Sequence, residues 1–310
     1  MLKVTHLVCF ALTALLSPAL AGPRADHVFI ISFDGGKPSV IADSEMPTIK
    51  RMAAEGAVTW VANTIFPPKT LPSHTSMLTG VGPEKHLVDW NSYMPLRGKV
   101  RVPTVFALAR QHNATLGTAM FAGKTKFRHL WQQGSLDLFD FGGPQEDVAV
   151  PGTTEVEQAV VPAQYVAKGA AAYIVEKKPA LCFIHFPDAD SAGHKSGWGS
   201  PEQKEAFKVC DQALSQIVKA IEQAGIKDRS VVLITADHGG TLKNHSANTP
   251  DDMNIPWIAW GKGVKKSFRI TGPVTTYDTA ATALWLLDIP LPEVLDGKPV
   301  TGAFEEAASE

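Results

Sequence analysis

The chain has 310 residues, of which 29 are Lys or Arg and 31 are Asp or Glu, so its formal net charge is −2. Because there is no basic excess, electrostatic binding to nucleic acid is not expected. The chain has three cysteines, and since no two of them are closely spaced, a thiolate zinc site is not expected either. Cys182 and Cys210 form a disulfide or remain as two buried thiols; the sequence leaves both alternatives open.

The first 21 residues have the pattern of a secretory signal peptide. Lys3 precedes an apolar run, Leu7–Leu16, and Ala19–Ala21 places small residues on both sides of a cleavage site. The apolar run is too short for an ordinary membrane span, so no membrane anchor is expected. The sequence therefore predicts a secreted or periplasmic protein whose mature part, residues 22–310, is one large domain.

An uninterrupted apolar segment, His27–Phe33, opens the mature part and predicts a central strand buried on both faces. A helix is expected at Pro47–Glu55, because proline favours a first helical turn and a glycine follows the segment. The next strand is expected at Val58–Phe66. After two prolines, Thr70 is expected at the start of a helix that ends at Gly80.

Strands and helices continue to alternate through the rest of the chain. Further strands are expected at Thr115–Ala122, Leu136–Phe141, Ala180–Phe186, Ser230–Ala236 and Ile255–Trp260, and further helices at Thr104–His112, Glu155–Lys178, Pro201–Ala224 and Thr276–Leu287. This alternation predicts an α/β fold with a doubly wound, mostly parallel central sheet and helices on both faces. In such folds, ligands bind outside the carboxyl ends of the strands.

Acidic residues and histidines follow three of the expected buried strands. Asp34 follows the first strand, Asp190 and His194 follow Ala180–Phe186, and Asp237 with His238 follows Ser230–Ala236; His245 lies a few residues further on. A carboxylate and an imidazole four residues apart can face one point and suit Zn²⁺ or a similar divalent ion. Each group alone also fits a turn or a capping residue, but their common position at strand ends favours a site.

Thr70 is the candidate nucleophile. At a helix start, its hydroxyl faces free backbone N–H groups and the positive end of the helix dipole, which stabilise an alkoxide or a bound anion. A simple helix cap is the alternative interpretation.

These motifs resemble those of the alkaline phosphatase superfamily, in particular its type I phosphodiesterase/nucleotide pyrophosphatase branch. The similarity rests on Asp34-Gly35, on Lys69-Thr70-x-Pro72-x-His74, on Asp190-x-x-x-His194 and on Asp237-His238-Gly239. It implies an alkaline phosphatase-like catalytic domain with two zinc ions and a threonine nucleophile. One ion would be held by Asp34, Asp237 and His238 together with Thr70, and the other by Asp190, His194 and His245. Asn91 would donate to a phosphate oxygen.

Three departures from the family pattern matter. His245 is the last histidine of the chain, whereas longer family members place their last histidine ligand much further on, so the second site is either completed by a shortened loop or incomplete. The chain is also short, so insertions that confer specificity are expected to be missing. Finally, Thr70 and His74 stand where sulfatases carry a cysteine or serine and an arginine, which argues against a sulfatase.

The sequence leaves monoester and diester substrates open. Lys124 and Lys126 follow a strand and would favour a dianionic monoester if they contact substrate, whereas a solvated basic loop is the alternative. Trp90, Tyr93 and Trp198 are candidates for a nucleotide-base pocket or for ordinary packing.

The sequence thus predicts a secreted, metal-dependent hydrolase of small phosphoric esters, of the phosphodiester or nucleotide pyrophosphate type, that acts through a phosphorylated Thr70. One alternative is a phosphomonoesterase or phosphonate hydrolase with the same site. The other is a binding protein that retains the fold without turnover.

Overall fold

A computed structural model of the protein describes residues 24–142 and 158–306. Within these ranges an eight-stranded sheet runs in the order β4-β3-β5-β1-β6-β7-β2-β8. The strands are β1 His27–Phe33, β2 Ala57–Asn63, β3 Thr118–Ala122, β4 Leu138–Asp140, β5 Leu181–Phe186, β6 Ser230–Ala236, β7 Asn254–Gly261 and β8 Phe268–Arg269. The expected signal peptide, residues 1–21, lies outside the described residues.

The sheet is parallel except at one strand. β1 pairs in parallel with both β5 and β6, while β7 is antiparallel to β6 and to β2. β1, β5 and β6 are buried along their whole length, as expected for central strands covered on both faces. The prediction of a mostly parallel, doubly wound sheet is therefore confirmed.

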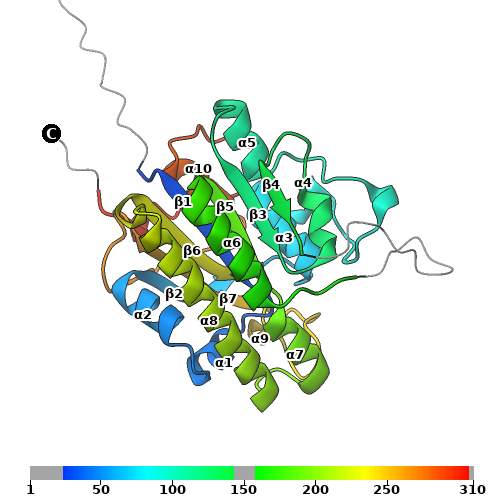
Figure 1. The fold of residues 1–310 in the computed structure, drawn as a ribbon. Coiled ribbons are helices and arrows are strands. Elements are labelled where there is room, and N and C mark those ends of the chain that lie inside the picture. The colour runs from blue at the N-terminus through cyan, green and yellow to red at the C-terminus, as the bar shows by residue number, and fades with distance from the viewer. Residues whose placement is uncertain (1–23, 143–157, 307–310) are drawn as a thin grey trace, which may run out of the picture.

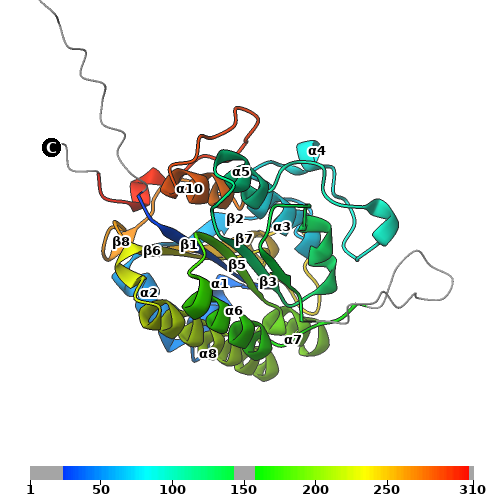
Figure 2. The same ribbon diagram turned by 45° about the horizontal axis from the view of Figure 1, so that its top comes forward.

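Helices cover both faces of the sheet, as Figures 1 and 2 show. One face carries α1 Pro38–Asp43, α2 Pro47–Glu55, α6 Ala163–Lys177 and α8 Pro201–Gln223, and the other carries α3 Thr70–Thr79, α5 Val105–His112 and α10 Asp278–Leu286. Alternate residues of β1 point into the two cores: Phe29 and Ile31 pack with the first group of helices, whereas Val28 and Ile30 pack with the second. Shorter helices are α4 Pro83–His86, α7 Asp188–Ser196 and α9 Pro250–Met253.

Several expected elements have wrong bounds, such as the strand expected from Thr115, which begins at Thr118. For two others the contacts show the reason. The strand expected to reach Phe66 ends at Asn63, because the Thr64 N–H leaves the sheet and donates to the carbonyl of Met253. The helix expected at Glu155–Lys178 begins only at Ala163, within the described part of that range. Before α6, the Val161 N–H donates to the carbonyl of Gly123, which follows β3. This bond holds the segment before α6 beside the end of β3, so the segment is not helical.

Cys182 lies on β5 and Cys210 on α8, and both are free thiols, so the alternative of a disulfide between them is wrong. Both side chains are fully buried in the same apolar core, and burial raises the pKa of each thiol. Among the described helices, none is both long and apolar enough to cross a membrane.

Candidate metal centre and active site

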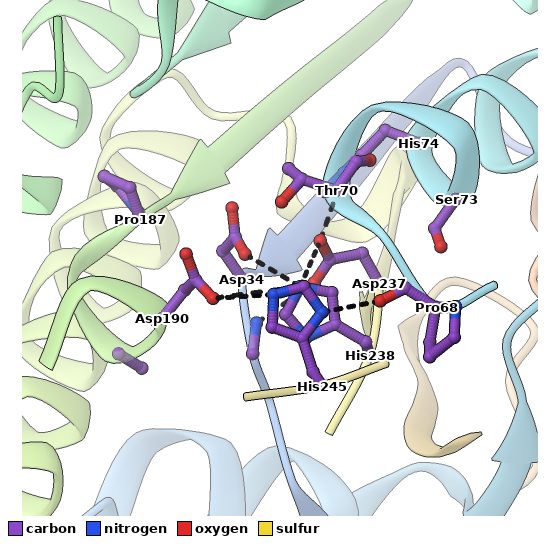
Figure 3. Close-up of polar contacts among 12 residues, drawn as sticks. Asp34, Pro68, Thr70, Ser73, His74, Pro187, Asp190, Asp237, His238 and His245 are labelled. Atoms are coloured by element: carbon purple, nitrogen blue, oxygen red, sulfur yellow. Dashed lines mark hydrogen bonds and ion pairs between the residues drawn. The ribbon is translucent and has the colours of Figure 1, made fainter. Parts of the chain in front are cut away.

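The predicted site residues converge at the carboxyl ends of the central strands (Figure 3). Asp34 follows β1, Asp190 and His194 lie on α7 just after β5, and Asp237 and His238 follow β6. α3 starts at Thr70 beside them. The parallel pairing of β1 with β5 and β6 is what brings these segments, far apart in sequence, to one place.

The first group comprises Asp34, Asp237 and His238, each fully buried. His238 Nε2 lies 3.4 Å from Asp34 Oδ1 and 3.2 Å from Asp237 Oδ2. The adjacent side chains of Asp237 and His238 thus converge, although neighbours in a chain ordinarily diverge. The Gly35 N–H donates to Asp237 Oδ1 at 3.0 Å and so holds this carboxylate in place.

The second group comprises Asp190, His194 and His245. On α7, Asp190 and His194 are one turn apart, and His194 Nε2 lies 3.3 Å from Asp190 Oδ1. His245 Nε2 lies 3.1 Å from His194 Nε2 and 3.8 Å from Asp190 Oδ1. Asp188, two residues before Asp190, points away from this group, since its carboxylate accepts from the Ala163 N–H at the start of α6.

All three histidines present Nε2 to the centre for the same reason. Nδ1–H of His194 donates to the carbonyl of Lys243, that of His245 to Pro68 and that of His238 to Gly239. Because a carbonyl only accepts, Nδ1 carries the proton, and Nε2 is left with a lone pair in the neutral ring. A hydrogen bond from Nδ1–H to a carbonyl is the arrangement that orients histidine ligands toward metals.

Four buried polar atoms in the centre have no hydrogen-bond partner: Asp34 Oδ1, Asp190 Oδ1, Asp237 Oδ2 and His238 Nε2. Leaving a buried carboxylate oxygen unpaired is costly, so a cation between these atoms would satisfy them. Nε2 of His194 and Nε2 of His245 lie 3.1 Å apart with their lone pairs facing each other, and a cation bound by both nitrogens would remove this repulsion. Two sets of side chains have ligand atoms close enough together to hold a divalent metal ion: Asp190, His194 and His245, and Asp34, Asp190 and His238. Asp237 lies beside the second set, with its Oδ2 3.2 Å from His238 Nε2.

The charges in the centre also favour a cation. Burial, together with the charge of Asp34, raises the pKa of Asp237 to about 8. Although burial opposes a positive charge, Asp237 and Asp34 raise the pKa of His238 to about 9. Burial and the charge of His238 lower the pKa of His245 to about 3, so its ring is neutral and suited to bind a metal at neutral pH.

Lys124 lies inside the site and not on a solvated loop. Its Nζ is 2.6 Å from Asp34 Oδ2 and 2.6 Å from Asp190 Oδ2, and the residue is only 7% exposed. Although burial opposes its charge, the two carboxylates raise the pKa of Lys124 well above its usual range. Lys126 is half-buried, and burial and the charge of Lys124 lower its pKa to about 8.

His185 is a site residue that the sequence did not single out. On β5, its Nδ1 accepts from the Gly123 N–H at 3.2 Å, so its Nε2–H donates to Asp34 Oδ2 at 2.8 Å. Asp34 Oδ2 is thereby held by His185 and Lys124, while Oδ1 faces the centre. A histidine one residue before the end of a buried strand was the available signal, but such a residue fits the protein core equally well.

Thr70 is the first residue of α3 and is 1% exposed. Its carbonyl accepts from His74 Nδ1–H at 2.8 Å, and the Ser32 hydroxyl donates to His74 Nε2 at 2.7 Å. Burial lowers the pKa of His74 well below its usual range, so the ring is neutral and braces this turn. Asn91 lies at the same helix start, where its Oδ1 accepts from the Leu71 N–H at 2.9 Å.

Comparison with known proteins identifies the family of the chain. Residues 28–255 match the type I phosphodiesterase/nucleotide pyrophosphatase family. The chain belongs to this family. It is 26% identical over 267 residues to human ectonucleotide pyrophosphatase/phosphodiesterase family member 7, with 78% of this chain and 55% of that protein covered. It is 26% identical over 249 residues to the GPI ethanolamine phosphate transferase 1 of Gibberella zeae, covering 78% of this chain and 25% of that protein. The chain thus spans about half the length of the first of these relatives.

Solved structures show the same fold. Human ectonucleotide pyrophosphatase/phosphodiesterase 5 superposes with a TM-score of 0.71 at 14% identity, covering 90% of this chain and all of that chain. A 2-O GAG sulfatase superposes with a TM-score of 0.70 at 16% identity, covering 92% of this chain and 76% of that chain. The alkaline phosphatase-like fold expected from the motifs is therefore confirmed.

The double ion pair of Lys124 predicts a large effect on stability. Replacing it by methionine leaves the buried Asp34 and Asp190 without their fixed cation, so Lys124→Met should lower the free energy of unfolding of the chelator-treated mature protein by about 3 kcal/mol. Urea denaturation measures this change. Lys126→Met is the matched control and should leave the midpoint unchanged or raise it, because burial disfavours that charge. Equal losses in the two variants would contradict the structural role of Lys124.

Proposed function

We propose that the protein is a metal-dependent hydrolase of phosphoric esters that acts through a phosphorylated Thr70. The observation that carries the proposal is the convergence of unpartnered carboxylate oxygens and imidazole lone pairs beside the first residue of α3. Membership of the phosphodiesterase/nucleotide pyrophosphatase family supports the type of reaction.

Two divalent ions, with a preference for zinc, fit the two ligand groups. Asp34, Asp237 and His238, with Thr70, would hold one ion; Asp190, His194 and His245 would hold the other. Bound there, such ions lower the pKa of a hydroxyl and neutralise charge on the transferring phosphoryl group. The fit of His245 into the second group favours its completion by a shortened loop.

The chain's own residues position the reacting groups. Thr70 presents its hydroxyl at the start of α3, where the helix dipole favours negative charge. Asn91 uses its Oδ1 on the Leu71 N–H, which leaves its amide N–H₂ for a non-bridging phosphate oxygen. Phosphoryl transfer depends mainly on such positioning and charge neutralisation.

Diesters and nucleotide pyrophosphates are the proposed substrates, because the curated relatives include nucleotide pyrophosphatase/phosphodiesterases and a bis(5′-adenosyl)-triphosphatase. A solved murine relative, an inactive threonine-to-alanine variant of ectonucleotide pyrophosphatase/phosphodiesterase 5, binds AMP. The expected signal peptide supports secretion or export to the periplasm.

Monoester or phosphonate hydrolysis is the second candidate, and the placement of Lys126 favours it. It lies two residues after Lys124, whose Nζ contacts Asp34 and Asp190, and its pKa is lowered to about 8, so it remains a cation at neutral pH. A dianion brings one more charge than a diester and gains more from such a cation.

Replacing the proposed nucleophile tests the mechanism. Thr70→Ala should lower kcat by about three orders of magnitude or more on bis-p-nitrophenyl phosphate and p-nitrophenyl phosphate, while Thr70→Ser retains part of it. Zinc content should stay unchanged, because the other six ligands remain. Wild-type turnover by Thr70→Ala would rule out the nucleophile. Zinc-loaded wild type without turnover of either ester would favour the binding-protein alternative.

Metal stoichiometry tests the assignment of His245. The mature protein should bind two equivalents of zinc, and His245→Ala only one, because removal of one of three ligands abolishes the second site. Metal analysis after dialysis against buffered zinc measures both values. His112→Ala, which alters an exposed histidine on α5, is the control and should retain two. Two equivalents in His245→Ala would contradict the assignment.

The effect of pH distinguishes the two substrate classes. Lys126 is cationic below its pKa of about 8 and neutral above it, so kcat/KM for the monoester should fall relative to the diester as pH rises through 8. In Lys126→Met, the monoester should be the more affected substrate and the relative fall should disappear. Exposed Lys195→Met is the control. A pH profile identical in wild type and Lys126→Met would remove Lys126 from substrate binding.

A further inference from the structure

Trp198 lies on the connection between α7 and α8 and contacts the segments that carry the proposed ligands, without offering a ligand atom itself. Its ring centre lies 5.3 Å from that of His194, 5.7 Å from His245 and 6.3 Å from His238. The indole N–H donates to the carbonyl of Gly35 at 3.1 Å, next to Asp34. Its backbone N–H donates to the carbonyl of Leu242 at 2.7 Å, on the loop between His238 and His245.

Three glycines in the ligand motifs make room for this ring. A β-carbon on Gly240 would lie 2.2 Å from Cε2 of Trp198, and all three of its nearest neighbours would be indole atoms. A β-carbon on Gly193 would lie 2.9 Å from Cδ2, and one on Gly35 would lie 3.2 Å from Cζ2. The packing of Trp198 thus explains why position 240 lacks a side chain. At Gly193 the amide of Gln203, 2.8 Å away, and at Gly35 Cα of Asp190, 3.1 Å away, limit the space together with the ring.

These three glycines belong to three different ligand segments. Gly35 follows Asp34 at the end of β1, Gly193 precedes His194 on α7, and Gly240 comes two residues after His238. One rigid side chain therefore touches the chain beside a ligand in each segment that the sheet brings together. An aromatic ring with only two rotatable bonds holds neighbours at fixed distances at low entropic cost.

We propose that Trp198 is the positioning residue of the metal centre: its indole is the common surface on which the three ligand segments pack, and this sets the convergence of Asp34, His194 and His238. Through Leu242, it also fixes the loop that carries His245. This inference rests on the metal sites proposed above. Zinc binding by the unaltered protein tests the proposed metal sites. The comparison of Trp198 and Gly240 variants tests the role of Trp198, so either proposal can fail while the other stands.

A double-mutant cycle on the full mature chain tests the proposal, with zinc affinity measured by chelator competition. Trp198→Ala should weaken zinc binding by about tenfold or more, as removal of a group that orients ligands does. Gly240→Ala should weaken it by a similar factor in the wild-type background, because the new methyl group meets the indole. In the Trp198→Ala background, the same substitution should cost less than about twofold, because its obstacle is gone.

Gly239→Ala is the matched control. A β-carbon there would lie 2.0 Å from the backbone oxygen of Asp251, so its cost should be the same with and without Trp198. If Gly240→Ala alone does not fold, recovery of a folded circular dichroism spectrum in the double variant supports the proposal. Equal costs of Gly240→Ala in both backgrounds, or unchanged zinc affinity in Trp198→Ala, would overturn it.

Discussion

The constraint on which the rest of the site depends is the burial of three carboxylates in one small volume. Asp34, Asp190 and Asp237 lie together where three parallel strands end, and Lys124 supplies a fixed positive charge among them. Carboxylates so close together repel one another and are poorly solvated, so the arrangement persists only if positive charge balances it. The pKa values of Asp237, about 8, and His238, about 9, are raised for the same reason: each group retains a proton that offsets the negative charge.

The fold resolves this constraint by the same rule at each carboxylate. One oxygen is bound by the protein: Asp34 Oδ2 by His185 and Lys124, Asp190 Oδ2 by Lys124, and Asp237 Oδ1 by the Gly35 N–H. The other oxygen is left unpartnered toward the centre. The histidines obey the equivalent rule, with Nδ1–H on a backbone carbonyl and Nε2 directed inward. Each group thus offers one ligand atom in a fixed direction.

The sequence predicted the parallel sheet and the convergence of Asp34, Asp190 and Asp237, because buried apolar strands that end in acidic residues must place those residues at one edge of a parallel sheet. It did not predict His185 or the buried position of Lys124. Both depend on register: Ser32 is the partner of His185 in the pairing of β1 with β5, and local residues do not specify such a pairing between distant segments. The start of α6 at Ala163 was missed for a similar reason. The segment before it is held by a hydrogen bond from the Val161 N–H to the carbonyl of Gly123, which is distant in sequence.

The turn that carries Thr70, the proposed nucleophile, and the second group of proposed ligands are linked through the backbone. His245 donates Nδ1–H to the carbonyl of Pro68 at 2.6 Å, and Thr70 begins α3 two residues later. A shift of the loop that carries His245 would therefore move the backbone that sets the position of the Thr70 hydroxyl. His74 binds the same turn from its other side, through the Thr70 carbonyl and the hydroxyl of Ser32 on β1. The strand that leads to Asp34 and the loop that carries His245 thus both hold this turn. The alignment of the Thr70 hydroxyl with the two ligand groups is therefore set by the folded backbone and not by the rotamer of Thr70 alone.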